Sequence, residues 1–260
     1  MICAGIDAGS RTIKAVLLES DGLEIRAAGI VDQGVEQGAL ALALFERLLE
    51  ENRIGRREVG SIVATGYGRK LIDVAHATVT EITCQSYGVR HRVPEARTIV
   101  DIGGQDSKLT RLDDGGVVRD FVMNDRCAAG TGSFLEVIAE RMKVGIEGLG
   151  EMVARSRKPA AISSTCVVFA ETEILGLLAE GVPPEDIVAG VLRSIATRVS
   201  SMAGRNVRPP IVFTGGVALI PGMADALESA LGHPVVIAPD PQMTGALGAA
   251  IVALGLKASR

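Results

Sequence analysis

A thirteen-residue pattern occurs twice in the chain, and this repeat restricts the possible folds more than any other feature. Ile6 to Leu18 reads IDAGSRTIKAVLL, and Val100 to Leu112 reads VDIGGQDSKLTRL. At a constant offset of 94 residues, Asp7, Gly9 and Lys14 correspond to Asp101, Gly103 and Lys108. Three identities alone are compatible with coincidence in a chain with 31 glycines, but both copies lie between apolar strands. We favour a duplication, which predicts two similar lobes that face each other.

The order of the apolar segments indicates an α/β protein. Hydrophobic residues make up 47% of the chain but aromatic residues only 3%, so Val, Ile, Leu and Ala must build the core. Short apolar runs alternate with segments of helical periodicity. We expect strands at residues 2–7, 14–20, 61–65, 98–104, 211–216 and 235–239. We expect helices at residues 40–51, 71–89 (mostly helical), 133–142, 167–181, 185–202, 222–231 and 244–254.

A polar interruption near residues 93–97, which contains Pro94, predicts a boundary between two lobes. The N-terminal lobe would comprise residues 1–95. The C-terminal lobe would comprise residues 96–260, with its last helix returning toward the hinge.

Charge and cysteine usage exclude several classes of protein. The net charge of -4 gives no basic surface for nucleic acid or for an anionic membrane. The chain has neither a targeting segment nor an apolar run long enough to span a bilayer, so we expect a cytoplasmic protein. The four cysteines are far apart and form no C-x-x-C pair, which argues against a secreted disulfide framework and an intrachain zinc site.

The first copy of the repeat has the chemistry of a phosphate loop. Backbone N–H groups and the hydroxyls of Ser10 and Thr12 can face phosphate oxygens, with Lys14 as a nearby cation. Asp7 can hold Mg²⁺ through water. An ordinary hairpin would show the same few residues, so this copy alone is a weak signal.

The second copy and a third glycine pair strengthen the interpretation. Asp101 is followed by Gly103 and Gly104, a second loop of bare backbone, and Gln105 or Asp106 can orient an attacking water. In the third loop, Thr214-Gly215-Gly216, the absence of side chains allows close approach to an adenine or a ribose. Three such loops after three strands describe a nucleotide clamped between two lobes.

Two of the cysteines precede expected helices. The run CAAGTG after Asp125 and Arg126 suggests free N–H groups at a helix start beside Cys127, and Cys166 follows Ser163-Ser164-Thr165 in the same way. A buried structural thiol is the common role of such a cysteine, and it is our expectation for Cys3 and Cys84. Two thiolates cannot complete a four-thiolate site, but a twofold homodimer supplies four. A four-thiolate zinc site has the same ligand count as a four-thiolate iron–sulfur site, so iron content must distinguish these two kinds of site.

Together these motifs resemble a known family. The order of IDAGSRTIK, VDIGGQDSK and FTGG is similar to that of the actin, hexokinase and sugar-kinase ATPase superfamily. With ATGYGR, MNDRCAAGTGSFL, ISSTCVVFAETE and GALGAA, the whole chain resembles the activator ATPases of 2-hydroxyacyl-CoA dehydratases, which are grouped with the ATPase subunits of benzoyl-CoA reductase. The resemblance implies two ribonuclease-H-like lobes with the nucleotide in the cleft between them. Arg11 departs from the family, which more usually has a small hydroxyl residue there.

The resemblance also implies a set of functional residues. Asp7, Asp101 and Gln105 would be catalytic, and ATP or ADP would bind with Mg²⁺. The expected nucleotide-binding residues are Ser10, Arg11, Thr12, Lys14, Gly103, Gly104, Gln105, Gly130, Thr131, Gly132, Gly215, Gly216 and Gln242. One 4Fe-4S cluster per homodimer would be held by Cys127 and Cys166 of each subunit.

The implied activity is ATP-dependent transfer of a low-potential electron. A reduced ferredoxin or flavodoxin would be the donor, and an iron–sulfur dehydratase or acyl-CoA reductase would be the acceptor. Two alternatives stay open at this point. One is a small-molecule kinase of the same superfamily with structural cysteines, and the other is a nucleotide sensor without turnover.

Overall fold

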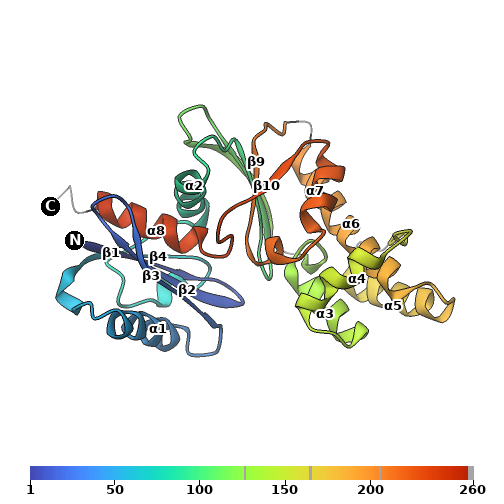
Figure 1. The fold of residues 1–260 in the computed structure, drawn as a ribbon, viewed down its shortest axis with the longest axis horizontal. Coiled ribbons are helices and arrows are strands. Elements are labelled where there is room, and N and C mark those ends of the chain that lie inside the picture. Colours follow the sequence, from blue (N-terminus) through green and yellow to red (C-terminus); the bar gives the residue numbers. More distant parts are fainter. Residues whose placement is uncertain (126, 164–165, 205, 257–260) are drawn as a thin grey trace. The chain divides into compact units, whose positions relative to one another are not determined.

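The structure is a computed structural model that describes residues 1–125, 127–163, 166–204 and 206–256. The chain forms two compact units, each built on a five-stranded sheet (Figure 1). The first unit contains Met1–Glu95, Gly115–Val118 and Ala238–Arg260, and the second contains Ala96–Asp114 and Arg119–Ile237.

The first unit is a sheet with helices on both faces. Its strands are β1 (Ile2–Ala8), β2 (Thr12–Glu19), β3 (Ile25–Asp32), β4 (Val59–Thr65) and β5 (Ala77–Thr78), in the order β3-β2-β1-β4-β5. The strand pairs β1–β2 and β2–β3 are antiparallel, whereas β1–β4 and β4–β5 are parallel. Its helices are α1 (Gln37–Glu51), α2 (Glu81–Arg92) and α8 (Thr244–Gly255), with 3₁₀ turns at Arg56–Glu58 and Arg69–Leu71.

Alternation along the central strand β1 explains this layering. Ile2, Ala4, Ile6 and Ala8 pack with α1, whereas Cys3 packs with α2 and α8 on the other face. At Gly5 a Cβ would collide with the Ala246 carbonyl, so the glycine allows α8 to lie directly on the strand. This contact places the closing helix with the first unit, whereas the sequence predicted that residues 238–260 belong to the second lobe.

The second unit repeats the sheet of the first and adds more helices. Its strands are β6 (Thr98–Ile102), β7 (Ser107–Leu112), β8 (Val118–Asn124), β9 (Ile211–Thr214) and β10 (Val235–Ile237). Their order is β10-β9-β6-β7-β8. Read in reverse, this order matches the first sheet, with β8, β7, β6, β9 and β10 in the places of β3, β2, β1, β4 and β5. The helices are α3 (Gly132–Met142), α4 (Leu149–Arg155), α5 (Val167–Ala179), α6 (Pro184–Ala203) and α7 (Met223–Leu231). The 3₁₀ turns are Ala128–Gly130, Ile146–Gly148 and Gly216–Leu219.

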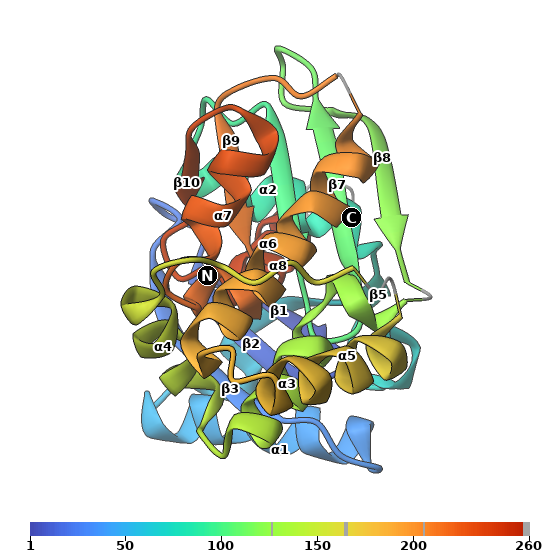
Figure 2. The same cartoon turned by 90° about the vertical axis from the view of Figure 1, so that its right-hand side faces the viewer.

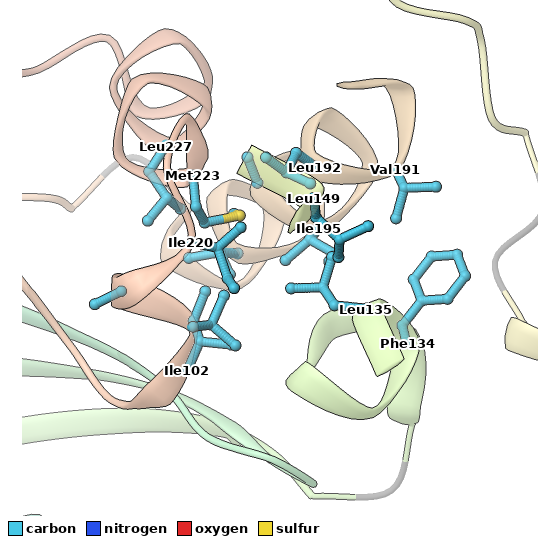
Figure 3. Packing of buried hydrophobic residues seen from close by; sticks show 14 of the residues in the cluster. Ile102, Phe134, Leu135, Leu149, Val191, Leu192, Ile195, Ile220, Met223 and Leu227 are labelled. Carbon is cyan, nitrogen blue, oxygen red and sulfur yellow. The ribbon is translucent and has the colours of Figure 1, made fainter. Parts of the chain in front are cut away.

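An aliphatic core holds the helices of the second unit on its sheet. Figure 3 shows Ile102 from the end of β6 in one cluster with Leu135 of α3, Ile195 of α6 and Met223 of α7. Figure 2 shows α6 running across this unit as its longest helix. The fold is therefore the mixed α/β architecture that the sequence predicted.

Several elements depart from those expected, and each departure has a local cause. Residues 71–89 were expected to be mostly helical, but α2 begins only at Glu81, because the Thr80 hydroxyl caps its start by accepting a hydrogen bond from the Thr83 N–H. Before it, the short strand β5 pairs with β4. The strands β3 and β8 and the helix α4 were not among the expected elements. The two strands lie at the edges of the sheets and α4 is short, so their sequence signals were weak.

Candidate functional site

The first loop of the repeat joins β1 to β2. Asp7 and Lys14 lie opposite each other in the antiparallel register, with Lys14 Nζ 3.6 Å from Asp7 Oδ2. The Gly9 N–H donates to the Thr12 carbonyl at 3.1 Å, and the Gln33 amide donates to the Gly9 carbonyl at 2.6 Å. The loop is therefore held in shape by backbone groups and by Gln33, a residue that was not expected to bind phosphate.

The residues expected to bind phosphate lie at the turn of this loop. Ser10 and Thr12 are partly buried, and Arg11 is exposed. The Arg11 carbonyl accepts a hydrogen bond from the Gln33 N–H at 2.9 Å, so its backbone supports the loop regardless of the side chain. The atypical residue at position 11 thus leaves the turn intact.

The second loop, between β6 and β7, has the same construction. Asp101 lies opposite Lys108 in the register, and the Gly103 N–H donates to the Asp106 carbonyl at 2.9 Å, as Gly9 does to Thr12. Lys108 is buried, with Nζ 2.7 Å from Asp106 Oδ1 and 3.7 Å from Asp101 Oδ2. The equal registers and turn bonds support the predicted duplication.

The side chain of Gln105 is exposed at the tip of this second loop. Gly103 and Gly104 beside it are partly buried. An exposed amide in this position is accessible to a ligand or a water.

The repeat extends to a second pair of loops, which the motif alignment missed. Thr65 and Thr214 end the parallel strands next to Asp7 and Asp101, and each is followed by a glycine of positive φ. The φ angles are +87° at Gly66 and +91° at Gly215. The signal was present in the sequence as the two Thr-Gly dipeptides of ATGYG and FTGGV.

Each of these glycines lies against a carboxylate of the repeat. A Cβ at Gly66 would be 2.5 Å from Asp7 Oδ1, and a Cβ at Gly215 would be 2.6 Å from Asp101 Oδ1. Glycine is therefore required at both positions by conformation and by space. Gly216 begins the 3₁₀ turn that follows.

The start of α3 is bonded directly to the second loop. The N–H groups of Gly132 and Ser133 donate to the carbonyls of Gly103 and Gly104 at 2.9 and 2.8 Å, and Ser133 Oγ donates to the Gly104 carbonyl at 2.6 Å. The expectation of free N–H groups at this helix start is wrong for these two, because the loop carbonyls occupy them.

The segment before α3 forms a 3₁₀ turn at Ala128–Gly130, so Cys127 precedes this turn and not α3 itself. Gly130, Thr131 and Gly132 are buried, and the Thr131 hydroxyl donates to the Ala128 carbonyl at 2.7 Å. On the other side, the Asn124 amide donates to the Cys127 carbonyl at 2.9 Å.

The four cysteines divide into two kinds. Cys3 and Cys84 are buried in the first unit, which confirms the expectation of core residues. Burial raises the pKa of the Cys84 thiol to about 11, which the Thr65 hydroxyl only partly offsets. Cys127 is half-buried and Cys166 is exposed, so these two thiols are accessible to different degrees.

The surroundings of Cys166 are unusually apolar for a surface. Cys166 is the N-cap residue of α5, and Val168 and Phe169 in the first turn are 68% and 69% exposed. Ser164 and Thr165, which precede Cys166 in the motif, lie outside the described residues. Two large apolar side chains are therefore exposed beside this thiol.

Gln242 is partly buried in the segment that leads into α8 of the first unit. Two residues later, Thr244 Oγ1 and Gln85 Oε1 are 2.9 Å apart.

Membrane-spanning helices and preformed metal clusters are both absent from the described part of the chain. Within the described ranges, no helix is long and apolar enough to cross a membrane. The same residues contain no group of three or more His, Cys, Asp or Glu side chains placed to hold a metal ion.

Comparisons with known proteins agree with the geometry. The sequence profile described as the BadF/BadG/BcrA/BcrD ATPase family matches residues 4–253. The activator of lactoyl-CoA dehydratase from Anaerotignum propionicum is 43% identical over 254 residues, which are 97% of each chain.

Two solved structures extend the comparison. The activator of the 2-hydroxyisocaproyl-CoA dehydratase from Clostridium difficile with bound ADPNP has a TM-score of 0.93 and 39% identity, covering 100% of this chain and 96% of that one. A ROK family glucokinase from Streptomyces griseus has a TM-score of 0.60 at 13% identity, covering 98% and 100% of the two chains, which is a likeness of fold alone.

Proposed function

Because the chain belongs to the BadF/BadG/BcrA/BcrD ATPase family, we propose that it is an ATP-hydrolysing activator that delivers one electron to a 2-hydroxyacyl-CoA dehydratase or a related acyl-CoA reductase. This is the family that the motifs predicted. The printed functions of the relatives support the proposal, and the residues described above supply the chemistry.

The two loops of the repeat bind the phosphates of ATP in this proposal. Ser10, Thr12 and Lys14 of the first loop and Gly104 of the second offer hydroxyls, an N–H group and a cation. Gly103, whose N–H donates to the Asp106 carbonyl, shapes the second loop beside them. Gly130, Thr131, Gly132, Gly215, Gly216, Gln242 and the Arg11 backbone complete the proposed nucleotide site. ADPNP, an ATP analogue, is bound in the related Clostridium difficile activator.

The carboxylates carry the hydrolytic chemistry in this proposal. Asp7 and Asp101 would hold Mg²⁺, in part through water, because this ion keeps much of its hydration shell. Gln105 orients the water that attacks the terminal phosphate, which yields ADP and phosphate. Lys108, paired with Asp101 and Asp106, holds both carboxylates in place.

A single observation supports a coupling between the nucleotide site and Cys127: the hydrogen bonds between the second loop and the start of α3. Gly132 and Ser133 fix the carbonyls of Gly103 and Gly104, and Cys127 lies only a few residues before them. In this proposal, a change in the loop on nucleotide binding or hydrolysis shifts the start of α3 and, through the short segment between them, Cys127. A nucleotide acts in this way only through different affinities for the two arrangements.

The donor chemistry of Cys127 and Cys166 fits a 4Fe-4S cluster. Neither thiol forms a disulfide and both have access to the surface, whereas the other two cysteines are buried. A second copy of the chain supplies two more thiols and covers the apolar start of α5. When bound, the cluster supplies one low-potential electron, which comes from a reduced ferredoxin or flavodoxin and goes to the acceptor enzyme.

Two substitutions test the hydrolytic part of the proposal. Asp101→Asn and Gln105→Ala should retain the fold and the iron content, because neither residue is in the core or near the thiols in sequence. Both should lose ATP turnover by roughly a hundredfold or more. Wild-type turnover in both variants would refute these roles.

A further inference from the structure

The segment that leads to Cys166 is anchored differently from the Cys127 segment. Residues 156–163, which follow α4, are the described part of the segment between α4 and Cys166. Their hydrogen bonds run to α5 and α6, whereas the Cys127 segment is followed by residues bonded to the second phosphate loop.

Asp186, in the first turn of α6, fixes the beginning of this segment. Its Oδ1 accepts hydrogen bonds from Ser156 Oγ at 2.7 Å, from the Arg157 N–H at 2.8 Å and from the Lys158 N–H at 2.9 Å. The Asp186 carbonyl also accepts a bond from the Ala160 N–H at 2.8 Å. One residue therefore determines the path of the chain over five positions.

Glu173, in the second turn of α5, fixes the end of the segment. Its Oε1 accepts two bonds from one residue, the N–H and the hydroxyl of Ser163, both at 2.8 Å. Ser163 lies three positions before Cys166, and Cys166 caps the same helix that carries Glu173. The carboxylate thus ties the approach to Cys166 to the helix that Cys166 begins. Hydrogen bonds to an ionised acceptor are stronger than neutral ones.

We propose that Glu173 and Asp186 are positioning residues that hold the approach to the Cys166 thiol against α5 and α6. This inference rests on the proposed function, in which Cys166 is a cluster ligand. It adds that the two ligands of one chain are anchored differently: residues shortly after Cys127 bond the second phosphate loop, and the approach to Cys166 bonds α5 and α6.

The test compares Glu173→Ala with Glu173→Gln, which retains an oxygen acceptor, and with Glu180→Ala on the same helix. Glu180 is exposed at the end of α5, so its removal controls for the loss of one charge. In the cluster-free protein, hydrogen exchange of the Ser163 amide should rise by roughly tenfold or more in Glu173→Ala, and little in the other two variants.

The second readout is made after anaerobic reconstitution. Glu173→Ala should bind less iron per dimer or show an altered electron paramagnetic resonance spectrum of the reduced cluster, and Glu173→Gln should restore both. A wild-type spectrum and full iron content in Glu173→Ala would overturn the inference. If wild-type protein itself binds no iron, the proposed function fails, while the exchange result still reports whether Glu173 holds Ser163.

Discussion

Replacing Ser133 with alanine should weaken the connection between the second phosphate loop and the Cys127 segment. The Ser133 hydroxyl donates to the Gly104 carbonyl at 2.6 Å, and the Ser133 N–H donates to the same oxygen at 2.8 Å. A hydrogen bond of this kind contributes about 0.5–1.5 kcal/mol. Since the carbonyl keeps its bond to the N–H, we expect Ser133→Ala to lower the free energy of unfolding by about 1 kcal/mol, or Tm by roughly 2–4 °C.

The matched control is Ser200→Ala in α6. The Ser200 hydroxyl is also partly buried and donates to a backbone carbonyl of another element, that of Ala230, at 2.8 Å. The two variants should therefore lose similar stability. Only Ser133→Ala should change the response to nucleotide, because about 1 kcal/mol of lost coupling is a factor of about five in an equilibrium constant.

The assay measures alkylation of Cys127 in the cluster-free protein, with and without a non-hydrolysable ATP analogue, by mass spectrometry of the Cys127 peptide. We expect the analogue to change the rate in wild type and in Ser200→Ala, and to change it about fivefold less in Ser133→Ala. An undiminished nucleotide effect in Ser133→Ala, or an equal loss in Ser200→Ala, would refute the reasoning.

Three further predictions follow from close contacts and from one carboxylate. Gly215→Ala should reduce ATP turnover in a steady-state assay by roughly a hundredfold, since its Cβ would displace the Asp101 carboxylate beside it. Gly232→Ala, with a positive φ but open space, should lower the free energy of unfolding by about 1–2 kcal/mol and leave ATP turnover unchanged. Gly248→Ala should lower Tm, because its Cβ would meet the backbone of α2 at an overpacking cost of about 1–3 kcal/mol. Gly255→Ala at the end of the same helix has open space and should leave Tm unchanged. An equal Tm in both variants would contradict the close packing of α8 on α2. Hydrogen bonds from backbone N–H groups and a serine hydroxyl lower the pKa of Asp186 in the folded protein. The contribution of Asp186 to folding stability is therefore present above the usual Asp pKa of about 4 and is lost as pH falls through the lower folded pKa. In urea unfolding measured at several acidic pH values, Asp186→Asn should lack this pH dependence.

Much of the fold was predictable because its signals are local. The strands β1 and β6 are continuous apolar runs, and each leads into an Asp and a glycine turn, which fixes both the strand end and the loop chemistry. The constant offset of the repeat indicates that Asp7 and Asp101 occupy equivalent positions, as do Lys14 and Lys108, and the registers of the two hairpins agree with this. Edge strands such as β3, with alternate residues half-buried, gave weaker signals.

The parts of the site that the sequence did not predict depend on contacts between distant residues. Nothing local to Ser133 indicates that its hydroxyl meets the Gly104 carbonyl, and free N–H groups were expected there instead. The role of Gly66 also depends on a distant residue, because its partner carboxylate is on another strand. The same is true of Glu173, whose partner Ser163 lies ten positions earlier in the chain, before the helix that carries Glu173.

The most direct test of the account is the iron and sulfide content of the anaerobically purified and reconstituted protein, measured together with its mass in solution. The account predicts a dimer with about four iron and four sulfide ions per two chains, and loss of both in Cys127→Ser and in Cys166→Ser. An iron-free wild-type dimer after reconstitution, or a monomer that carries the metal, would contradict it.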